Sequence, residues 1–181
     1  FGLTWPLVTR ADGTKFGKTA DGAIWLDASR TSPYQFRQYF IQIADADIEK
    51  MLMQFSLRSV EVVNEIIAEQ VLRPETRIAQ RSLARELTAL VHGDAAAEAT
   101  EDAAAVLFGA NPTSASLDTM KLIASEVPVT QMGSAALGDA IGVLVQTNLA
   151  TSNTEARRLL SQKSVRANGE QVDEQTNLAK I

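Results

Sequence analysis

The spacing of apolar and polar positions predicts a mainly helical chain with a few short strands. Between residues 33 and 93 apolar side chains recur every three or four positions in four successive stretches, and turn-forming residues separate them. Each stretch is preceded by a residue that favours a helix start, and the last is followed by a glycine. The predicted boundaries are Ser32 as a cap before Pro33, Asp45 as a cap, Ser59 as a cap, and Pro74 to His92 closed by Gly93.

Short β elements are predicted on either side of a polar loop near the beginning of the chain. The apolar stretches Leu3–Val8 and Ile24–Leu26 are typical of strands. Between them, Asp12-Gly13 and Asp21-Gly22 are dipeptides that favour tight turns. The first 32 residues are therefore expected to belong to the edge of a domain that contains a sheet.

The remaining sequence predicts an acidic helix, a connector and a small α+β domain. The acidic helix starts at Asp94 and closes at Gly109, and a segment rich in Ser, Thr, Pro and Gly follows it. Two helices come next, the second with Ser152 and Glu155 as a capping box. Asn168-Gly169 then predicts a hairpin. The predicted domains are residues 1–32, 33–93, 94–136 and 137–181.

Composition narrows the class of protein. The 181 residues are 45% hydrophobic, contain no cysteine and only one histidine, and carry a net charge of -5. Disulfides and thiolate metal sites are thereby excluded, and no protein-bound metal is expected. No apolar run approaches the roughly 18 residues that a membrane span needs, and no charged-then-apolar leader precedes the first segment. A cytoplasmic protein without a membrane partner is expected.

The negative charge is concentrated in the middle of the chain. Residues 93–149 hold seven acidic residues and one basic residue, whereas residues 1–40 and 150–181 each have a small basic excess. A polyanionic partner would therefore meet the two ends.

The main candidate for chemistry is the loop "TKFGKT" at residues 14–19. Lys15 and Lys18 flank Phe16 and Gly17, and the loop closes on the hydroxyl of Thr19. Lysine places a compact positive charge on a flexible stem, which suits contact with phosphates, and a glycine lets the backbone approach a ligand closely. By spacing alone, a solvated hairpin loop is the alternative interpretation.

A second basic group lies near the end of the chain. The positions are Arg157, Arg158, Lys163 and Arg166, on or just after a predicted helix. Together they could hold nucleic-acid phosphates, although ordinary surface basicity explains the spacing equally well.

The fourth predicted helix offers two weaker candidates. Arg77, Arg81 and Arg85 recur every four residues, so they would share one helix face. We favour a solvated face, paired to Glu69, Glu75 or Glu86, over an RNA contact. His92 is expected to interact with carbonyls at the helix end rather than with a nucleotide.

Four stretches of the chain resemble one family in the same order. "PLVTRADGTKFGKT" closely resembles the second signature of bacterial tyrosyl-tRNA synthetases, class I enzymes in which this loop closes over ATP. "IWLD", "TSPYQFRQYF" and "AQRSLARELTALVHG" are similar to the segments that follow it. The tail "ATSNTEARRLLSQKSVRANGEQVDE" resembles the family's RNA-binding domain, of the type named after ribosomal protein S four.

The resemblance implies a domain plan and an activity. Residues 1–32 would end a class I catalytic domain, 33–93 would form a helical anticodon-binding domain, and 137–181 an S-four-like domain. The activity implied is tyrosine activation by ATP to tyrosyl-adenylate, then transfer to the 3' end of tyrosine tRNA. Lys15, Lys18 and Thr19 would act in catalysis, and Phe16 and Gly17 would join them in binding ATP. Mg²⁺ would arrive on the nucleotide, and a homodimer would form through the catalytic half.

Departures from the family pattern lead to further expectations. The family's nucleotide-binding half and tyrosine pocket are expected before the lysine loop, so we expect the 181 residues alone to be inactive. The tail is expected to continue into another basic strand. Lys163-Ser164 stands in a turn where relatives often carry glycine. Two alternatives remain open, a stand-alone RNA-binding protein and a structural or regulatory fragment with no RNA role.

Overall fold

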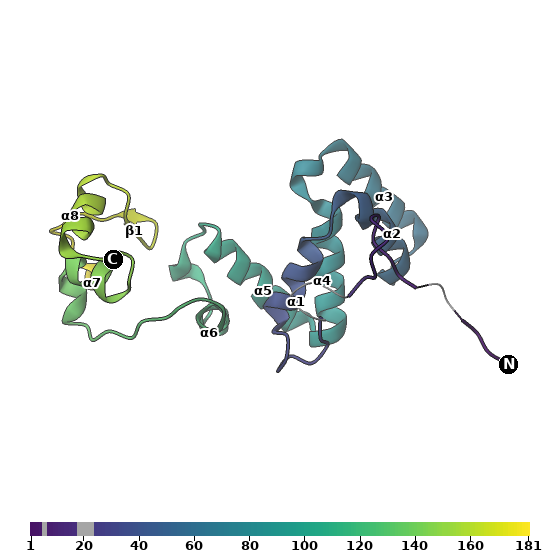
Figure 1. Ribbon diagram of the computed structural model, residues 1–181, viewed down its shortest axis with the longest axis horizontal. Helices are drawn as coiled ribbons and strands as arrows, with labels where there is room; N and C mark the ends of the chain where they lie inside the picture. Colours follow the sequence, from purple (N-terminus) through teal and green to yellow (C-terminus); the bar gives the residue numbers. More distant parts are fainter. Residues whose placement is uncertain (5–6, 18–23) are drawn as a thin grey trace. The chain divides into compact units, whose positions relative to one another are not determined.

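A computed structural model describes residues 1–4, 7–17 and 24–181 (Figure 1). The chain divides into two compact units, Phe1–Glu101 and Asp102–Ile181. Within the described residues the structure is mainly helical, with one two-stranded sheet, so the predicted class of mainly α with small β elements is confirmed. No helix in the described ranges combines the length and apolar character needed to cross a bilayer.

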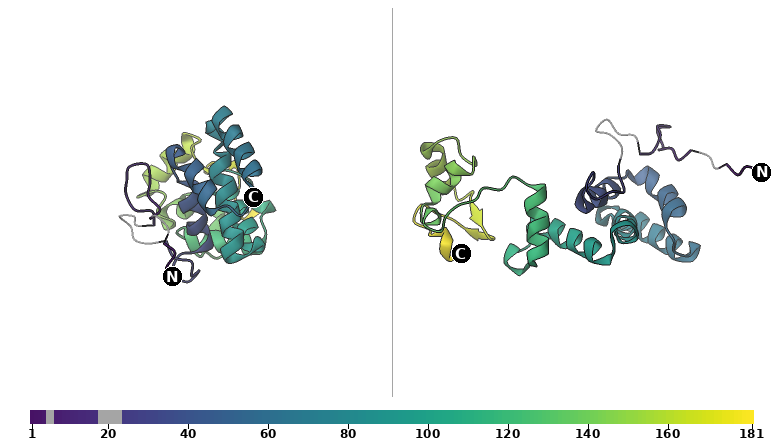
Figure 2. Two further views of the ribbon diagram at one scale, coloured as in Figure 1. Left: turned by 90° about the vertical axis from the view of Figure 1, so that its right-hand side faces the viewer. Right: turned by 90° about the horizontal axis from the view of Figure 1, so that it is seen from below.

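Packing against α4 organises the first unit. α4 (Ile78–His92) packs on α1, α2 and α3, and its contact with α1 is the most extensive (Figures 1 and 2). The three partner helices are α1 (Pro33–Ile41), α2 (Asp45–Phe55) and α3 (Val60–Leu72). The buried core is apolar, with Phe36, Phe40, Ile43, Ile48, Met51, Leu52, Val63, Ala79, Leu83, Ala84 and Leu87.

The predicted N-cap residues are confirmed at two of the first three helices, α1 and α3. The hydroxyl of Ser32 accepts a hydrogen bond from Gln35 N at the start of α1, and that of Ser59 accepts one from Val62 N at the start of α3. Asp45 was expected to cap α2, and this prediction is wrong. Ala44 occupies the cap position and Asp45 is the first helical residue, where its carboxylate accepts a hydrogen bond from Gln80 Nε2 at 2.6 Å.

The predicted helix from Pro74 to His92 is interrupted at Arg77. Pro74–Thr76 form a short 3-10 turn, and Arg77 adopts a left-handed backbone with φ of 52° and ψ of 37° before α4 begins. The Arg77 guanidinium donates hydrogen bonds to Ile41 O (2.8 Å) and Ile43 O (3.0 Å). Bonding to these carbonyls offsets the strain of a non-glycine residue at positive φ. As predicted, Gly93 ends α4, at a φ of 91°.

The two strands predicted near the beginning of the chain are not formed in the described residues. Leu3, Leu7 and Val8 lie outside any strand, and Trp5 and Pro6 fall outside the described residues. The segment from Ile24 is irregular: Trp25 N donates to Thr31 Oγ1, and the Arg30 guanidinium lies over the Trp25 ring. Strand-like composition does not make a strand unless a neighbour pairs with its backbone. The turn predicted at Asp21-Gly22 lies outside the described residues.

The second unit begins within the acidic helix and contains one helix that the pattern did not predict. α5 (Asp94–Leu107) starts in the first unit and extends into the second, and Gly109 follows it at a φ of 111°. The segment expected to be a plain connector contains α6 (Leu117–Glu126). Ser116 caps α6 by accepting a hydrogen bond from Thr119 N, and Ile123 is buried. Ser116 followed by this helical spacing was the signal for α6 in the sequence.

A small core holds the last 42 residues together. α7 (Ala140–Gln146) packs against α8 (Asn153–Ser161), and β1 (Arg166–Ala167) pairs with β2 (Glu170–Gln171) in antiparallel register. The short 3-10 turns Pro112–Ser114, Ala136–Gly138 and Leu178–Lys180 complete the unit. The buried apolar residues of this small core are Ala140, Leu144, Ala150, Ala156, Leu160 and Val172.

The predicted hairpin is confirmed, and the capping box is shifted by one residue. Asn168 and Gly169 both have positive φ, 50° and 86°, as a type I′ turn requires. The amide of Asn168 donates to Ile181 O, so the last residue lies beside the hairpin (Figure 2). Ser152 accepts from Glu155 N as expected, but the Glu155 carboxylate accepts from Thr151 N rather than from Ser152 N.

We expect the stability of the first unit to fall in weak acid because of His92. Its ring packs edge-on against Phe36, with ring centroids 5.0 Å apart, and Nε2 is buried without a hydrogen-bond partner in the described structure. The predicted bond to helix-terminal carbonyls is therefore wrong for this nitrogen. Burial lowers the pKa of His92 below its usual 6.5. The unfolded chain consequently binds the proton first, and stability is lost as pH falls through about 6.5.

Unfolding by urea at pH 7.5 and 5.5 would measure this loss. His92 is the only histidine, so a His92→Leu variant should lose less stability than the unmodified protein between these pH values. Equal losses in the two proteins would show that His92 does not titrate differently on folding.

A second stability prediction concerns Arg77. Arg77→Ala removes both hydrogen bonds to the α1–α2 turn and leaves alanine in a left-handed backbone, so unfolding should require about 2–3 kcal/mol less free energy. Arg77→Gly loses the same bonds without the backbone strain and should be milder. Arg73→Ala is the matched control, because Arg73 makes an exposed ion pair with Glu69. Equal effects of Arg77→Ala and Arg73→Ala on urea denaturation would contradict the role of Arg77.

Candidate functional site

The candidate catalytic residue Lys15 lies in a tight hairpin, which we call the lysine hairpin (residues 8–17). Phe16 N donates to Val8 O (3.0 Å) and Arg10 N to Thr14 O (2.9 Å), so Thr9 and Lys15 pair as an antiparallel bridge. Gly13 N donates to Arg10 O, and Gly13 has a φ of 80°. The turn predicted at Asp12-Gly13 is confirmed. This geometry is a three-residue hairpin loop with glycine at the position that needs positive φ.

Asp12 stabilises the turn at the tip of the lysine hairpin. Its carboxylate accepts hydrogen bonds from the Thr14 hydroxyl (2.6 Å) and from Thr14 N (2.9 Å). The hydroxyl bond, followed by the backbone bond, lowers the pKa of Asp12 below its usual value. Asp12 therefore stays ionised at neutral pH, and the bonds that close the turn stay charge-assisted.

Lys15 and Phe16 are adjacent residues of the hairpin with opposite environments: one is exposed to solvent and the other packs against the helices. The Lys15 side chain is exposed and forms no ion pair within the described residues. The next side chain, Phe16, packs against an aromatic group from the helices, with ring centroids 5.5 Å from Tyr39 and 5.6 Å from Phe55. Successive side chains of an extended segment point to opposite sides. Burial of Phe16 therefore directs Lys15 toward solvent.

Three polar side chains from α1 and α2 bind the backbone of the lysine hairpin, and we call them the hairpin anchor (Tyr39, Asp47 and Lys50). Asp47 Oδ1 accepts from Ala11 N at 2.5 Å. Lys50 Nζ donates to Thr9 O at 2.8 Å and Thr9 Oγ1 at 3.2 Å. Tyr39 OH accepts from Gly17 N at 3.2 Å. The hairpin is thus fixed on both of its arms by helices that lie more than 20 residues further along the chain.

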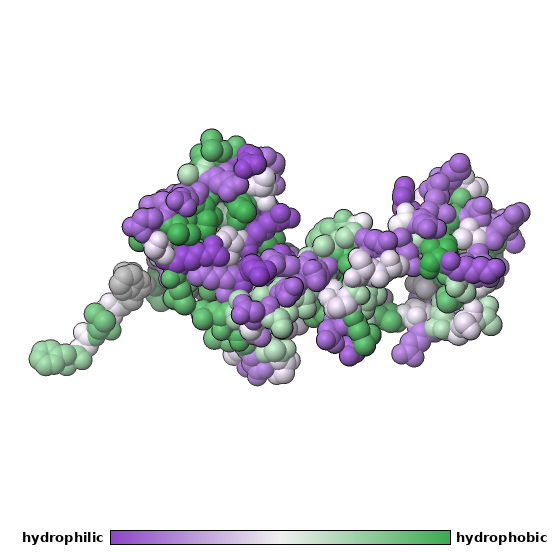
Figure 3. Space-filling view, turned by 180° about the vertical axis from the view of Figure 1, so that it is seen from behind, coloured by the Kyte–Doolittle hydropathy of each residue, from purple (hydrophilic) through white to green (hydrophobic). Residues whose placement is uncertain are grey.

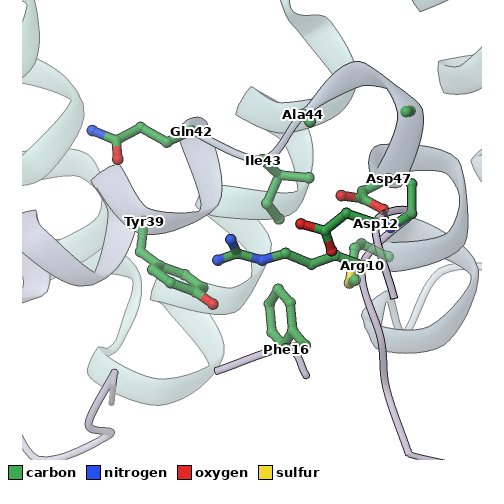
Figure 4. Close-up of a pocket in the computed structure, with 11 residues that line it drawn as sticks. Arg10, Asp12, Phe16, Tyr39, Gln42, Ile43, Ala44 and Asp47 are labelled. Atoms are coloured by element: carbon green, nitrogen blue, oxygen red, sulfur yellow. Dashed lines mark hydrogen bonds between the residues drawn. The ribbon is translucent and has the colours of Figure 1, made fainter. Parts of the chain in front are cut away.

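A cavity of about 440 Å³ lies between the lysine hairpin and the α1–α2 turn (Figure 4). Figure 4 shows the Arg10 side chain running across it toward Tyr39, with Phe16 on one side and Ile43 on the other. Asp12 and Asp47 also line the cavity. Because one guanidinium and two carboxylates share the lining, the cavity favours neither an anion nor a cation.

The described structure includes only some of the residues expected to bind ATP. Lys15, Phe16 and Gly17 are described, and Lys18 and Thr19 lie outside the described residues. Gly17 has a φ of 80°, a conformation that favours glycine. Gly17 is also the residue whose N–H donates to the Tyr39 hydroxyl.

The basic group near the end of the chain is exposed throughout. Arg157 pairs with Glu174 at 3.3 Å, Arg158 with Glu155 at 3.6 Å, and Arg166 donates to Gly169 O at 3.0 Å. Lys163 has a left-handed backbone with φ of 58°, which fits the expectation that a glycine would suit this turn. In Figure 3 hydrophilic residues cover much of the visible surface at this end of the chain.

The arginines predicted to share a face of the fourth helix do not do so. Arg77 precedes α4 and binds backbone carbonyls of the α1–α2 turn, which leaves Arg81 and Arg85 on the helix. Arg85 pairs with Glu101. The partners expected for these arginines pair elsewhere: Glu69 bonds Arg73 and Glu86 bonds Arg58. An ion-paired surface was expected, but the predicted partners were wrong.

No metal site is evident in the described ranges, where no three His, Asp or Glu side chains gather as ligands. The residues that sequence reasoning missed are the three of the hairpin anchor. Tyr39 lies among the recurring apolar positions of the first predicted helix, which give no sign of a polar role. Asp47 and Lys50 stand three apart on α2, so they share a face, but no sequence pattern shows what that face meets.

Comparison with known proteins gives a consistent result. The family model described as tRNA synthetases class I (W and Y) matches residues 1–109. A tyrosine–tRNA ligase of Roseiflexus castenholzii is 44% identical over 88% of this chain and 39% of its own length. One from Neisseria meningitidis is 42% identical over 93% of this chain and 39% of its own length. A truncated mitochondrial tyrosyl-tRNA synthetase of Coccidioides posadasii, a solved structure, is 39% identical over 56% of this chain and 26% of that one, with a TM-score of 0.48.

The chain thus spans about two fifths of the length of the curated relatives that it matches. The family match includes both the lysine hairpin and the helices that hold it. On this match, the chain belongs to the class I tRNA synthetases of the tryptophan and tyrosine type.

Proposed function

We propose that this chain supplies the ATP loop and tRNA-binding parts of a tyrosine–tRNA ligase. The supporting observation is identity of 42–44% to tyrosine–tRNA ligases over about nine tenths of the chain, together with a family match that includes the lysine hairpin. The reaction proposed is attack of the tyrosine carboxylate on the α-phosphorus of ATP, which releases pyrophosphate, followed by transfer of tyrosine to the 3' end of tyrosine tRNA. The alternative of a stand-alone RNA-binding protein leaves the lysine hairpin without a role.

The role of the lysine loop follows from where charge develops. As the bond between the α-phosphorus and the bridging oxygen breaks, negative charge grows on the departing pyrophosphate. An ammonium group that meets this charge stabilises the transition state more than the ground state, and therefore raises the rate of activation. Lys15 is exposed on the hairpin and Lys18 follows the fixed residue Gly17. Mg²⁺ would arrive with the nucleotide, and Thr19 would add a hydroxyl.

We assign the finer domain roles on the same basis. The helices of residues 33–93 are proposed as an anticodon-binding domain, and residues 137–181 as an S-four-like RNA-binding domain. What supports the second assignment is a helix pair followed by a hairpin, with exposed cations at Arg157, Arg158, Lys163 and Arg166. A homodimer through a catalytic domain completes the proposal.

The lysine prediction is tested in the full-length protein. Lys18→Ala should reduce the rate of tyrosine activation by about 100-fold, roughly 3 kcal/mol, while tyrosine binding stays nearly unchanged. Lys15→Ala should act in the same direction. Lys121→Ala, which removes an exposed lysine paired with Asp118, is the control. Pyrophosphate exchange and tyrosine titration separate the two quantities. A loss of tyrosine affinity with unchanged turnover would assign the loop a packing role instead.

The RNA prediction uses the salt dependence of tRNA binding. Exposed ion pairs are worth only about 0–1 kcal/mol, so the contacts of Arg157 with Glu174 and Arg158 with Glu155 can give way to phosphates. Removing both arginines should reduce the slope of log affinity against log salt by roughly 2 if each contacts a phosphate. Tyrosine activation should not change, because it needs no RNA.

The control for the RNA prediction removes two other exposed cations that lie outside both proposed RNA-binding domains. Arg30→Ala with Lys121→Ala changes the net charge equally and should leave the slope nearly unchanged. If the variant lacking Arg157 and Arg158 keeps both slope and affinity, these arginines are a solvated face.

A further inference from the structure

The polar groups of the hairpin anchor bond to the hairpin, although the Tyr39 ring also packs against Phe40. The core of the first unit is closed by apolar side chains of α1 to α4, and the three polar groups of the anchor point away from it toward the lysine hairpin. Within the described residues, the Asp47 carboxylate, the Lys50 ammonium and the Tyr39 hydroxyl bond only to hairpin atoms. Their contacts therefore act on the hairpin more than on the helix bundle.

The position of Asp47 strengthens its bond to the hairpin. Asp47 lies in the first turn of α2 and its side chain is buried, 7% exposed. The helix N-terminus favours a negative charge there, and a bond from a backbone N–H to a carboxylate is stronger than one between neutral groups. Lys50, one turn further on, binds the opposite side of the same arm through Thr9. Asp47 and Lys50, which carry opposite charges on one face of α2, thus bind adjacent peptide groups of the hairpin.

Tyr39 holds the other arm at its last described residue. Its hydroxyl accepts the Gly17 N–H, and its ring packs against Phe16. Gly17 has positive φ, and this hydrogen bond holds its backbone against α1. The anchor therefore fixes both sides of the lysine hairpin, and leaves Lys15 exposed.

We propose that Tyr39, Asp47 and Lys50 are positioning residues for ATP activation. They hold Thr9, Ala11 and Gly17, and so set the place from which Lys15 reaches the departing pyrophosphate. Loss of the anchor leaves the Lys15 ammonium group present but spreads it over many positions, which lowers the fraction of time in a productive geometry. This inference rests on the proposed function.

The test compares two acidic residues of α2. Asp47→Ala removes the bond to Ala11 N, whereas Glu49→Ala removes an exposed carboxylate of the same helix and no bond to the hairpin. In the full-length protein, Asp47→Ala should lower the rate of tyrosine activation about 10-fold with tyrosine affinity unchanged. Glu49→Ala should leave the activation rate within about twofold. Asp47→Asn keeps an acceptor oxygen at this position and should recover most of the lost rate.

Amide hydrogen exchange provides a second readout that needs no activity. Tyr39→Phe removes only the hydroxyl, so Gly17 should exchange about 10-fold faster while the amides of α4 keep their protection. Asp47→Asn should leave Ala11 protected, and Asp47→Ala should expose it. Tyr39→Phe should also lower the activation rate a few-fold, which keeps the test valid if Asp47→Ala does not fold.

The outcomes separate this inference from the proposed function. Faster exchange at Gly17 and Ala11 together with slower activation supports the positioning role. Equal activation rates for Asp47→Ala and Glu49→Ala, or faster exchange with unchanged activation, would overturn it. If the unmodified protein activates no tyrosine, the proposed function fails and the positioning role with it, while the exchange data still establish or exclude the anchor as a contact.

Discussion

The first unit depends on how the backbone of the α1–α2 turn finds hydrogen-bond partners. A helix end leaves carbonyls unpaired, and Ile41 and Ile43 lie where α1 stops. Arg77 binds both carbonyls, and Gln80 donates to Ile43 O and to Asp45 at the start of α2. The beginning of α4 thereby fixes the beginning of α2. Without these side-chain donors, the direction in which α2 leaves the turn would be set only by apolar packing.

This constraint extends to the lysine hairpin through α2. Asp47 and Lys50 stand on the first two turns of α2, and they bind Ala11 and Thr9. A shift of α2 by one residue would move both side chains off the hairpin, because helix neighbours turn by about 100° per residue. The left-handed residue Arg77, more than 60 positions away in sequence, therefore helps to place Lys15. Selection for an accurate loop would act on the helices as strongly as on the loop itself.

Sequence patterns correctly predicted the helices and the hairpin that are stabilised by interactions between residues close together in the sequence. Apolar spacing and the caps Ser32 and Ser59 marked α1 and α3, and Asn168-Gly169 marked the β1–β2 hairpin, since each depends on neighbours within a few residues. The strand predicted at Ile24–Leu26 failed because a strand needs a partner that the segment itself does not supply. The break at Arg77 was missed for a similar reason, because its positive φ is stabilised by carbonyls 34 and 36 residues away.

The same distinction separates the parts of the candidate site. The lysine spacing and the glycine turn are visible in a short stretch of sequence, so the loop itself could be predicted. The hairpin anchor could not, because each of its bonds joins residues separated by 22 to 41 positions and uses a backbone group of the hairpin, which has no side-chain signature. The basic group near the end of the chain is an intermediate case. The sequence indicated a group of cations on or just after a helix, but it did not indicate the ion pairs with Glu155 and Glu174.

The two ends of the chain use positive charge in different ways. At the lysine hairpin, backbone bonds fix the segment and leave Lys15 without an ion pair in the described structure, which suits a contact that must form at one point of a reaction. Near the end of the chain, Arg157 and Arg158 already have exposed carboxylate partners. Exchange of such partners for phosphates costs little, because the pairs are weak in water. On the proposed function, the unpaired cation at Lys15 suits catalysis, and the paired, exposed arginines suit reversible binding along a polyanion.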